Sequence, residues 1–136
     1  MAAPNQAPHV NQITGAVVNG AMKVHSVLGP GLLESAYQAC LAHELRSRGL
    51  HVATEVGLPV FYEGKKIELG YRIDLLLENI VVVEVKCAEA IHPVHQAKLL
   101  SYMRLSGRQV GLLVNSYVAH LRDGIKRMVD GAGWEK

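Results

Sequence analysis

The chain has 136 residues, of which 49% are hydrophobic and 19% are charged. A chain of this size and composition suits one domain with its own hydrophobic core, and it excludes a disordered protein. The formal net charge of +2 at pH 7 is too small to indicate nucleic-acid binding by itself. Basic residues gather in the last third of the chain. A basic rim beside an acidic pocket would suit a phosphodiester, and a solvated surface would show the same pattern.

The sequence shows neither a membrane-spanning segment nor a signal peptide. The longest apolar runs, such as Ile80–Val83, are strand-sized and too short to span a bilayer. The first ten residues lack the basic stretch and apolar core of a signal peptide. Cys40 and Cys87 fit no zinc-binding spacing, and we expect both to be reduced thiols. We therefore expect a cytoplasmic protein with no membrane partner.

Apolar periodicity predicts two helices at the start of the chain. From Val10 to Leu28, apolar residues recur at helical spacing. Gly29-Pro30-Gly31 ends this helix and starts another, which Gly49 ends in turn. The expected buried stripe of the second helix consists of Leu33, Ala36, Tyr37, Cys40, Leu41 and Leu45.

The pattern changes to strands after the second helix. His51–Tyr62 is expected to be extended, and Glu63-Gly64 makes a turn. Two further strands, Ile67–Leu77 and Ile80–Cys87, follow around a hairpin loop. A third helix is predicted at Pro93–Ser106, because proline suits the first turn of a helix and a glycine follows its end.

The C-terminal part completes the predicted sheet. Val110–Asn115 has the composition of a short, fully buried strand, and His120–Val129 predicts a strand or a short hairpin. The order is ααβββαβ plus a tail, which predicts one mixed sheet flanked by helices. We expect a single domain at 10–130, after a loose lead-in at 1–9 and before a C-terminal tail at 131–136.

Two neighbouring strands carry acidic side chains on one face of the predicted sheet. Side chains alternate along a strand, so Glu84 and Lys86 share a face while the valines between them face a core. The matching apolar face of the preceding strand consists of Ile73, Leu75 and Leu77. The register that keeps both apolar rows together pairs Leu77 with Val81 and places Asp74 beside Glu84.

Two carboxylates side by side favour a bound metal ion. Opposed like charges destabilise a sheet by roughly 0.2–1 kcal/mol, and by more when they are buried. A divalent cation removes this cost, and oxygen ligands favour a hard ion such as Mg²⁺ or Mn²⁺. The alternative is an ordinary ion pair of Glu84 with Lys86 or Arg72, but the surrounding Val and Leu runs indicate a central strand. Such an ion would lower the pKa of a bound water, and Lys86 beside it could orient that water or stabilise the charge that develops on a phosphate. This combination predicts metal-assisted phosphodiester hydrolysis.

These strands and several other motifs resemble a known family. Asp74 and Glu84-Val85-Lys86, after an N-terminal helix, resemble the PD-(D/E)xK nuclease superfamily. Residues 31–37, with the sequence GLLESAY, look like the signature of the bacterial GxxExxY protein family, a branch of that superfamily. The other matching motifs are His25 with Leu28-Gly29-Pro30-Gly31, Leu100-Ser101-Tyr102, Gly111-Leu112-Leu113-Val114-Asn115 and Asp123-Gly124-Ile125-Lys126-Arg127. The resemblance covers the chain from Val10 to Val129.

The resemblance implies a restriction-endonuclease-like α/β fold, with an αβββαβ core and an extra N-terminal helix. It implies that Asp74, Glu84 and Glu34 bind Mg²⁺ or Mn²⁺. Lys86 is the implied catalytic lysine, and these four residues form the implied catalytic set. Without the resemblance, Glu34 would be interpreted as a residue that complements the dipole of its helix.

Substrate contacts are expected on the third helix and on the strand of Asp74. His95, Lys98 and Tyr102 lie at i, i+3 and i+7, on one helix face. Lys98 stands where the family generally has a glutamine, and it would contact phosphate in its place. A solvated lysine beside a core tyrosine explains the same pattern. We predict that these three residues and Arg72 bind substrate.

The sequence supports two functions. The first is a Mg²⁺-dependent nuclease acting on DNA or RNA, and the second is a non-catalytic module that binds nucleic acid or protein with the same fold. Asp74 and the ExK motif favour the first, and the modest net charge favours the second. A domain this small would need a homodimer or another partner to read a base sequence. One Phe and one Trp predict no aromatic platform for single strands. Tyr37, Tyr71 and Tyr102 could stack on bases, but we expect them to pack in the core.

Overall fold

The computed structural model of the chain describes residues 6–31 and 33–130. Its helices are α1 (Gln6–Leu28), α2 (Glu34–Ser47), α3 (Pro93–Ser106) and the short 3-10 helix η2 (Leu121–Gly124). Its strands are β1 (Val52–Gly57), β2 (Val60–Tyr62), β3 (Lys65–Ile67), β4 (Arg72–Leu77), β5 (Val81–Lys86), β6 (Val110–Asn115) and β7 (Ile125–Val129). α1 begins inside the expected lead-in, whereas residues 1–5 and the expected tail at 131–136 lie outside the described residues.

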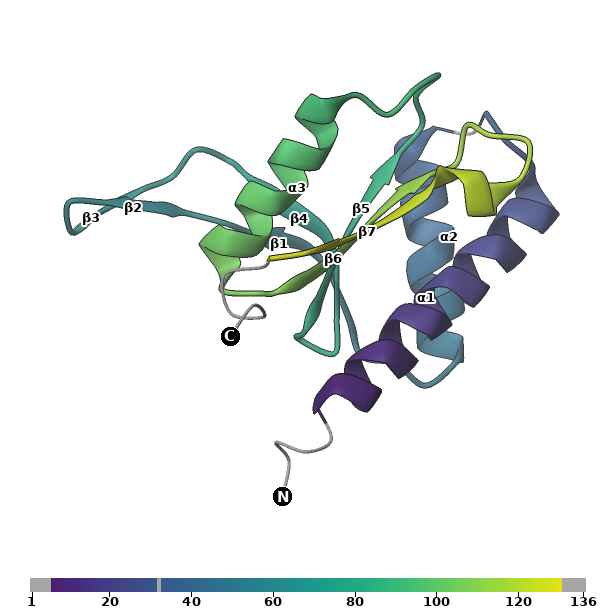
Figure 1. Cartoon of the computed structure of the whole chain (residues 1–136), viewed down its shortest axis with the longest axis horizontal. Coiled ribbons are helices and arrows are strands. Elements are labelled where there is room, and N and C mark those ends of the chain that lie inside the picture. Colours follow the sequence, from purple (N-terminus) through teal and green to yellow (C-terminus); the bar gives the residue numbers. More distant parts are fainter. Residues whose placement is uncertain (1–5, 32, 131–136) are drawn as a thin grey trace.

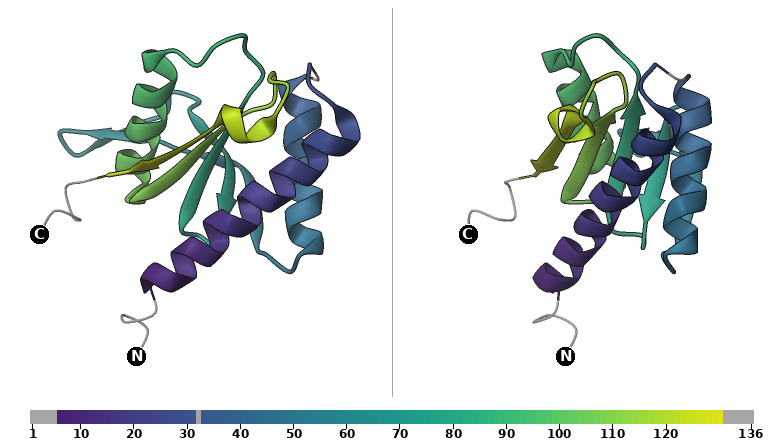
Figure 2. Two further views of the ribbon diagram at one scale, coloured as in Figure 1. Left: turned by 45° about the vertical axis from the view of Figure 1, so that its right-hand side comes forward. Right: turned by 90° about the vertical axis from the view of Figure 1, so that its right-hand side faces the viewer.

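Five strands form one mixed sheet in the order β1-β4-β5-β6-β7. β5 and β6 are parallel and are connected through α3, and the other neighbouring strands are antiparallel. α1 and α2 cover one face of the sheet, and α3 covers the other (Figure 1 and Figure 2). The expected mixed sheet flanked by helices is confirmed.

The central strand β5 is buried on both of its faces. Alternate valines of β5 pack against α1 and α2. Val82, which points the other way, packs with Leu99 and Met103 of α3. Glu84 shares this second face by alternation, and only 3% of its surface is exposed. The fold therefore buries a carboxylate in the middle of the sheet.

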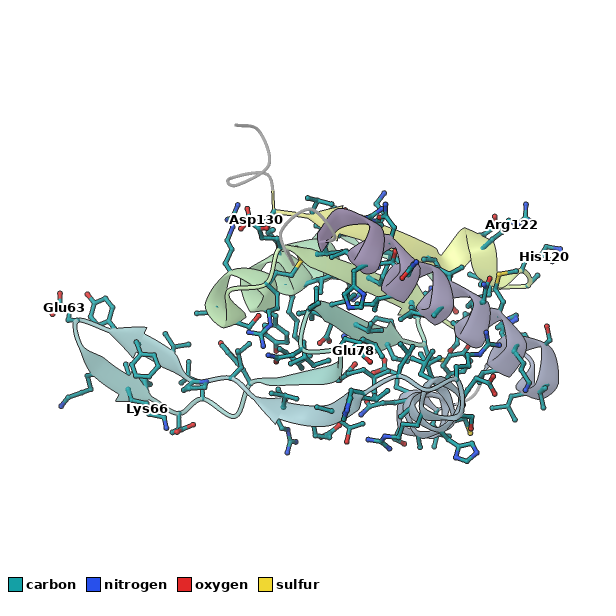
Figure 3. The ribbon with its side chains drawn as sticks, turned by 90° about the horizontal axis from the view of Figure 1, so that it is seen from below. Glu63, Lys66, Glu78, His120, Arg122 and Asp130 are labelled. Atoms are coloured by element: carbon teal, nitrogen blue, oxygen red, sulfur yellow. The ribbon has the colours of Figure 1, made fainter. Side chains whose placement is uncertain are left out.

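The predicted boundaries are most accurate for α3 and β6, which begin and end as the sequence predicts. The two extended segments before them are each divided, because β2 and β3 pair only with each other. They form a hairpin outside the main sheet, with Glu63 at its tip (Figure 1 and Figure 3). The expected strand or hairpin at 120–129 consists of η2 followed by β7. Within the described ranges, no helix is long and apolar enough to cross a membrane.

The predicted buried stripe of α2 is partly wrong. The exposed members are Leu33, Ala36 and Cys40. The buried members are Tyr37, Leu41 and Leu45, joined by Ala42. α2 packs on α1 and the sheet along one side only, so the apolar residues of its outer side stay in solvent. The Tyr37 hydroxyl fixes this contact by donating to the backbone oxygen of Ala21 in α1 at 2.6 Å.

The predicted position of Ile73 is also wrong. Regular alternation along β4 would place it beside Leu75, but Ile73 packs in the cluster beneath α3, whereas Leu75 faces α1 and α2. The ladder between β1 and β4 is interrupted at Glu55 and Asp74, and Glu55 has a φ of 54°. A residue in this conformation disrupts the regular pleat, so the side chains on either side of Asp74 face different clusters.

Gly124 allows η2 to lie against the end of β6. A Cβ atom at this residue would be 2.3 Å from the backbone oxygen of Asn115. We therefore expect Gly124→Ala to lower the free energy of unfolding by roughly 1–3 kcal/mol. The control is Gly15→Ala in α1, where nothing lies within 4 Å of the added atom and alanine favours the helix by about 1 kcal/mol. Urea unfolding measures both changes, and equal stability of the two variants would contradict this packing.

Candidate active site

Asp74 of β4 and Glu84 of β5 lie side by side in the sheet. The predicted register is confirmed, since residues 75–77 pair with residues 81–83 in the expected order. Beyond this ladder, the Val85 N–H donates to Asp74 Oδ2 at 2.9 Å, and the Asp74 N–H donates to Glu84 Oε2 at 3.3 Å. Each carboxylate is therefore held by a backbone donor of the other strand. We refer to Asp74 and Glu84 as the acid pair.

Burial makes the acid pair costly to ionise. Burial, followed by the charge of Asp74, raises the pKa of Glu84 from 4.5 to about 7. Burial also raises the pKa of Asp74, against the opposing effects of the Val85 N–H and the Lys86 charge. In the described part of the chain, no lysine or arginine forms an ion pair with either carboxylate. A cation bound at the pair would favour its ionised form.

Glu34 and Lys86 adjoin the acid pair. Glu34 is the first residue of α2, and its Oε2 accepts the N–H of Cys87 at 3.3 Å, just beyond the end of β5. Its charge contributes to the raised pKa of Asp74. Lys86 follows Glu84 on the same face of β5, and its charge opposes the rise in the pKa of both acids. The fold therefore brings together the four residues of the predicted catalytic set.

Two further residues, which the sequence does not single out, adjoin the acid pair. Gln38 lies one turn after Glu34, and its Nε2 donates to Glu55 Oε2 at 2.8 Å and to the Asp74 backbone oxygen at 3.4 Å. Glu55 of β1 contributes to the raised pKa of Asp74. The spacing of four residues from Glu34 could have indicated Gln38. Glu55 carries no such signal, because its position depends on the pairing of β1 with β4.

Lys98 and Tyr102 of α3 lie within electrostatic reach of the acid pair, on the helix face that their spacing predicts. The Lys98 charge opposes the rise in the pKa of Glu84. Burial, followed by the Glu84 charge, raises the pKa of Tyr102. Lys98 Nζ lies 5.5 Å from the centre of the Tyr102 ring, a distance at which a cation and an aromatic face attract.

His95 and Arg72, the other predicted substrate-binding residues, make contacts elsewhere. His95 Nδ1 accepts the backbone N–H of His92 at 3.1 Å and so caps the start of α3. Arg72 Nε lies 3.5 Å from Glu55 Oε1 in an exposed ion pair. Neither contact involves the acid pair, and a role of these two residues in substrate binding stays a prediction.

Asn115, at the end of β6, fixes the loop that follows β5. Its Oδ1 accepts the backbone N–H groups of Ala88 and Tyr117 at 3.1 and 3.2 Å. Its Nδ2 donates to the Ala88 backbone oxygen at 2.8 Å. This loop begins with Cys87, whose N–H binds Glu34. Asn115 therefore helps to hold Glu34 in place beside the end of β5.

A family model described as the PD-(D/E)XK nuclease superfamily matches residues 11–128, which include the acid pair, Glu34 and Lys86. The chain belongs to this superfamily. It matches no curated protein and no solved structure. The family match and the mixed sheet between helices together confirm the expected restriction-endonuclease-like fold.

PD-(D/E)XK nucleases generally use Mg²⁺ or Mn²⁺. Among residues 6–31 and 33–130, no three His, Cys, Asp or Glu side chains are grouped so that they could hold a metal ion. Mg²⁺ keeps several waters and usually takes one or two carboxylates from the protein. The oxygen donors of the acid pair therefore fit such an ion, whereas Glu34, which is bonded to the Cys87 N–H, stays a predicted ligand.

Ionisation of Glu84 should destabilise the metal-free fold. The pKa of Glu84 is higher in the folded state than in the unfolded state, so the free energy of unfolding falls as the pH rises from 4.5 to about 7. Above that range the whole decrease persists. We expect Glu84→Gln to raise the free energy of unfolding by on the order of 3 kcal/mol near pH 8, and to change it little near pH 4. Glu63→Gln, at the exposed hairpin tip, is the charge-matched control. Urea unfolding across this range measures the effect, and a difference independent of pH would contradict it.

Proposed function

We propose that this chain is a metal-dependent nuclease of the GxxExxY branch that hydrolyses phosphodiester bonds of DNA or RNA. The observation that carries the proposal is the buried acid pair with Lys86 directly beside it. Apolar residues at the same positions would commonly give a more stable protein, so two carboxylates there indicate a function. A homodimer is part of the proposal, because a domain of this size has little surface for base readout.

The proposed roles follow from the groups that each residue offers. Asp74 and Glu84 would hold Mg²⁺ or Mn²⁺, with Glu34 beside them. The bound ion would polarise a phosphoryl oxygen and lower the pKa of a water. Lys86 offers three N–H donors and a positive charge to the negative charge that develops on the phosphate. Lys98 offers the same groups to a neighbouring phosphate.

Loss of the Lys86 amine should abolish cleavage. We expect Lys86→Ala to lower the rate of metal-dependent cleavage by roughly 100-fold or more, as for other donors directed at developing charge. Lys23→Ala is the control, because this lysine is 59% exposed on α1 and should be dispensable. Gel assays with single- and double-stranded DNA and RNA, in Mg²⁺ or Mn²⁺, measure the rates and identify the preferred nucleic acid.

Other outcomes of this assay have definite meanings. Cleavage at an unchanged rate by Lys86→Ala would contradict the role of that lysine. No cleavage of any substrate, by a folded protein that still binds the metal ion, would favour the non-catalytic binding module with the same fold.

A metal ion at the acid pair should stabilise the fold. At about ten times the dissociation constant, linkage adds about 1.4 kcal/mol, or roughly 5 °C in melting temperature for a domain of this size. We expect this rise in the wild type and not in Asp74→Asn, whose amide oxygen can still accept the Val85 N–H. Without metal, Asp74→Asn should melt higher than the wild type near pH 8, because repulsion with Glu84 is removed. Thermal melts measure both effects, and equal metal-induced shifts would place the ion elsewhere.

A further inference from the structure

The β2–β3 hairpin exposes aromatic side chains that the core does not use. The hairpin projects from the body of the molecule, as Figure 1 and Figure 3 show. Phe61 and Tyr62 keep 67% and 63% of their surface exposed, and Tyr71, just before β4, keeps 41%. The expectation that Tyr71 packs in the core is therefore wrong. Exposed rings grouped on one element favour an interaction site.

The two faces of the hairpin differ. Strand pairing places Val60 opposite Ile67, Phe61 opposite Lys66 and Tyr62 opposite Lys65. Side chains alternate along a strand and directly opposed residues share a face, so Tyr62 and Lys65 lie on the face of Val60. Phe61 and Lys66 lie on the opposite face, where both are exposed. Val60 and Ile67 are half-buried, which identifies their face as the one turned toward the body.

A groove of about 530 Å³ lies between the Val60 face of the hairpin and α3. Its lining includes Val60, Tyr71, Lys98, Tyr102 and Arg104. At its inner end the Tyr71 and Tyr102 rings are 5.8 Å apart, and the Lys98 charge opposes the rise in the pKa of Glu84. The groove therefore connects the neighbourhood of the acid pair with the hairpin face that carries Tyr62 and Lys65.

We propose that single-stranded nucleic acid lies along this groove, with bases stacked on Tyr71 and Tyr62 and phosphates beside Lys98 and Lys65. This inference rests on the proposed nuclease function, because it names the substrate of the same site. Exposed rings favour unpaired bases, since the bases of a duplex are already stacked on one another. Lysines at both ends of the path supply the positive charge that a phosphate backbone requires.

A pair of ring variants separates the groove face from the opposite face of the hairpin. Tyr62→Ala removes a ring from the proposed path, and Phe61→Ala removes an equally exposed ring from the other face. Fluorescence anisotropy with labelled oligo(dT) and oligo(U), without divalent ions, measures binding by the intact chain. We expect Tyr62→Ala to weaken binding by roughly 5- to 100-fold and Phe61→Ala by less than about twofold, given the usual strength of one base–ring stack.

The lysines of the two faces provide a second, independent measurement. Lys65→Ala should lower the slope of log affinity against log salt by about 0.7, the contribution of one phosphate contact on a single strand. Lys66→Ala should leave the slope unchanged, because Lys66 lies on the opposite face and pairs with Glu68 at 3.2 Å. Equal effects within either pair of variants would overturn the proposal. So would tighter binding of a duplex, or no binding of any strand by the wild type.

A small substrate distinguishes failure of the proposed groove from failure of the proposed nuclease. A phosphodiester of a single nucleotide, thymidine 5′-(p-nitrophenyl phosphate), does not extend from the acid pair to the hairpin. Its hydrolysis by the wild type therefore tests the acid pair without the groove. No hydrolysis by the wild type would refute the nuclease alone, and unchanged oligonucleotide binding by Tyr62→Ala would refute the groove alone. A wild-type dimer that becomes a monomer in Tyr62→Ala would assign the hairpin face to a second copy and overturn the proposal.

Discussion

The protein buries two neighbouring carboxylates in the middle of its sheet, and the surrounding elements are arranged around this unfavourable contact. Asp74 and Glu84 each accept a backbone N–H from the other strand. Even so, burial and mutual repulsion raise the pKa of Glu84 to about 7. Apolar residues in place of buried charges commonly stabilise a protein, and β5 is buried along most of its length. Stability alone therefore does not account for the acid pair, whereas a site that binds a cation does.

The strand order explains why several other elements meet at this point. The N-terminus of α2 lies beside the end of β5, so Glu34 and Gln38 come next to the acid pair. α3 connects the parallel strands β5 and β6 and covers the face of Glu84, which brings Lys98 and Tyr102 into reach. Lys98 is held near the Tyr102 ring and forms no ion pair with the acids in the described part of the chain. Positive charge thus lies beside the carboxylates without neutralising them, which suits a site for both a cation and a phosphate.

Periodicity and alternation predicted most of this fold, because they report which side chains must be buried. The position of the acid pair follows from a single register, which the structure confirms along residues 75–77 and 81–83. The same rules fail at Cys40, since an apolar residue on the outer side of a helix has the same composition as one on the inner side. They fail at Ile73 because the positive φ of Glu55 disturbs the pleat, and no glycine marks that position. Glu55 joins the site only through the pairing of β1 with β4, which is a tertiary contact that local patterns do not encode.

The exposed rings of the hairpin are a second departure from the rule that apolar surface is buried. Full burial of such a ring contributes about 1.5–3 kcal/mol, which the fold forgoes at Phe61 and Tyr62. An isolated two-stranded hairpin is marginally stable in water, and β2 and β3 pair only with each other. Its base is closed by the Leu58 N–H, which donates to the Tyr71 backbone oxygen at 2.8 Å, so the hairpin continues directly from β1 and β4. The hairpin therefore leads directly into β4, which carries Asp74, and the groove lies between the hairpin and α3. This continuity along the chain and the groove together connect the proposed recognition of a strand with the site proposed to cut it.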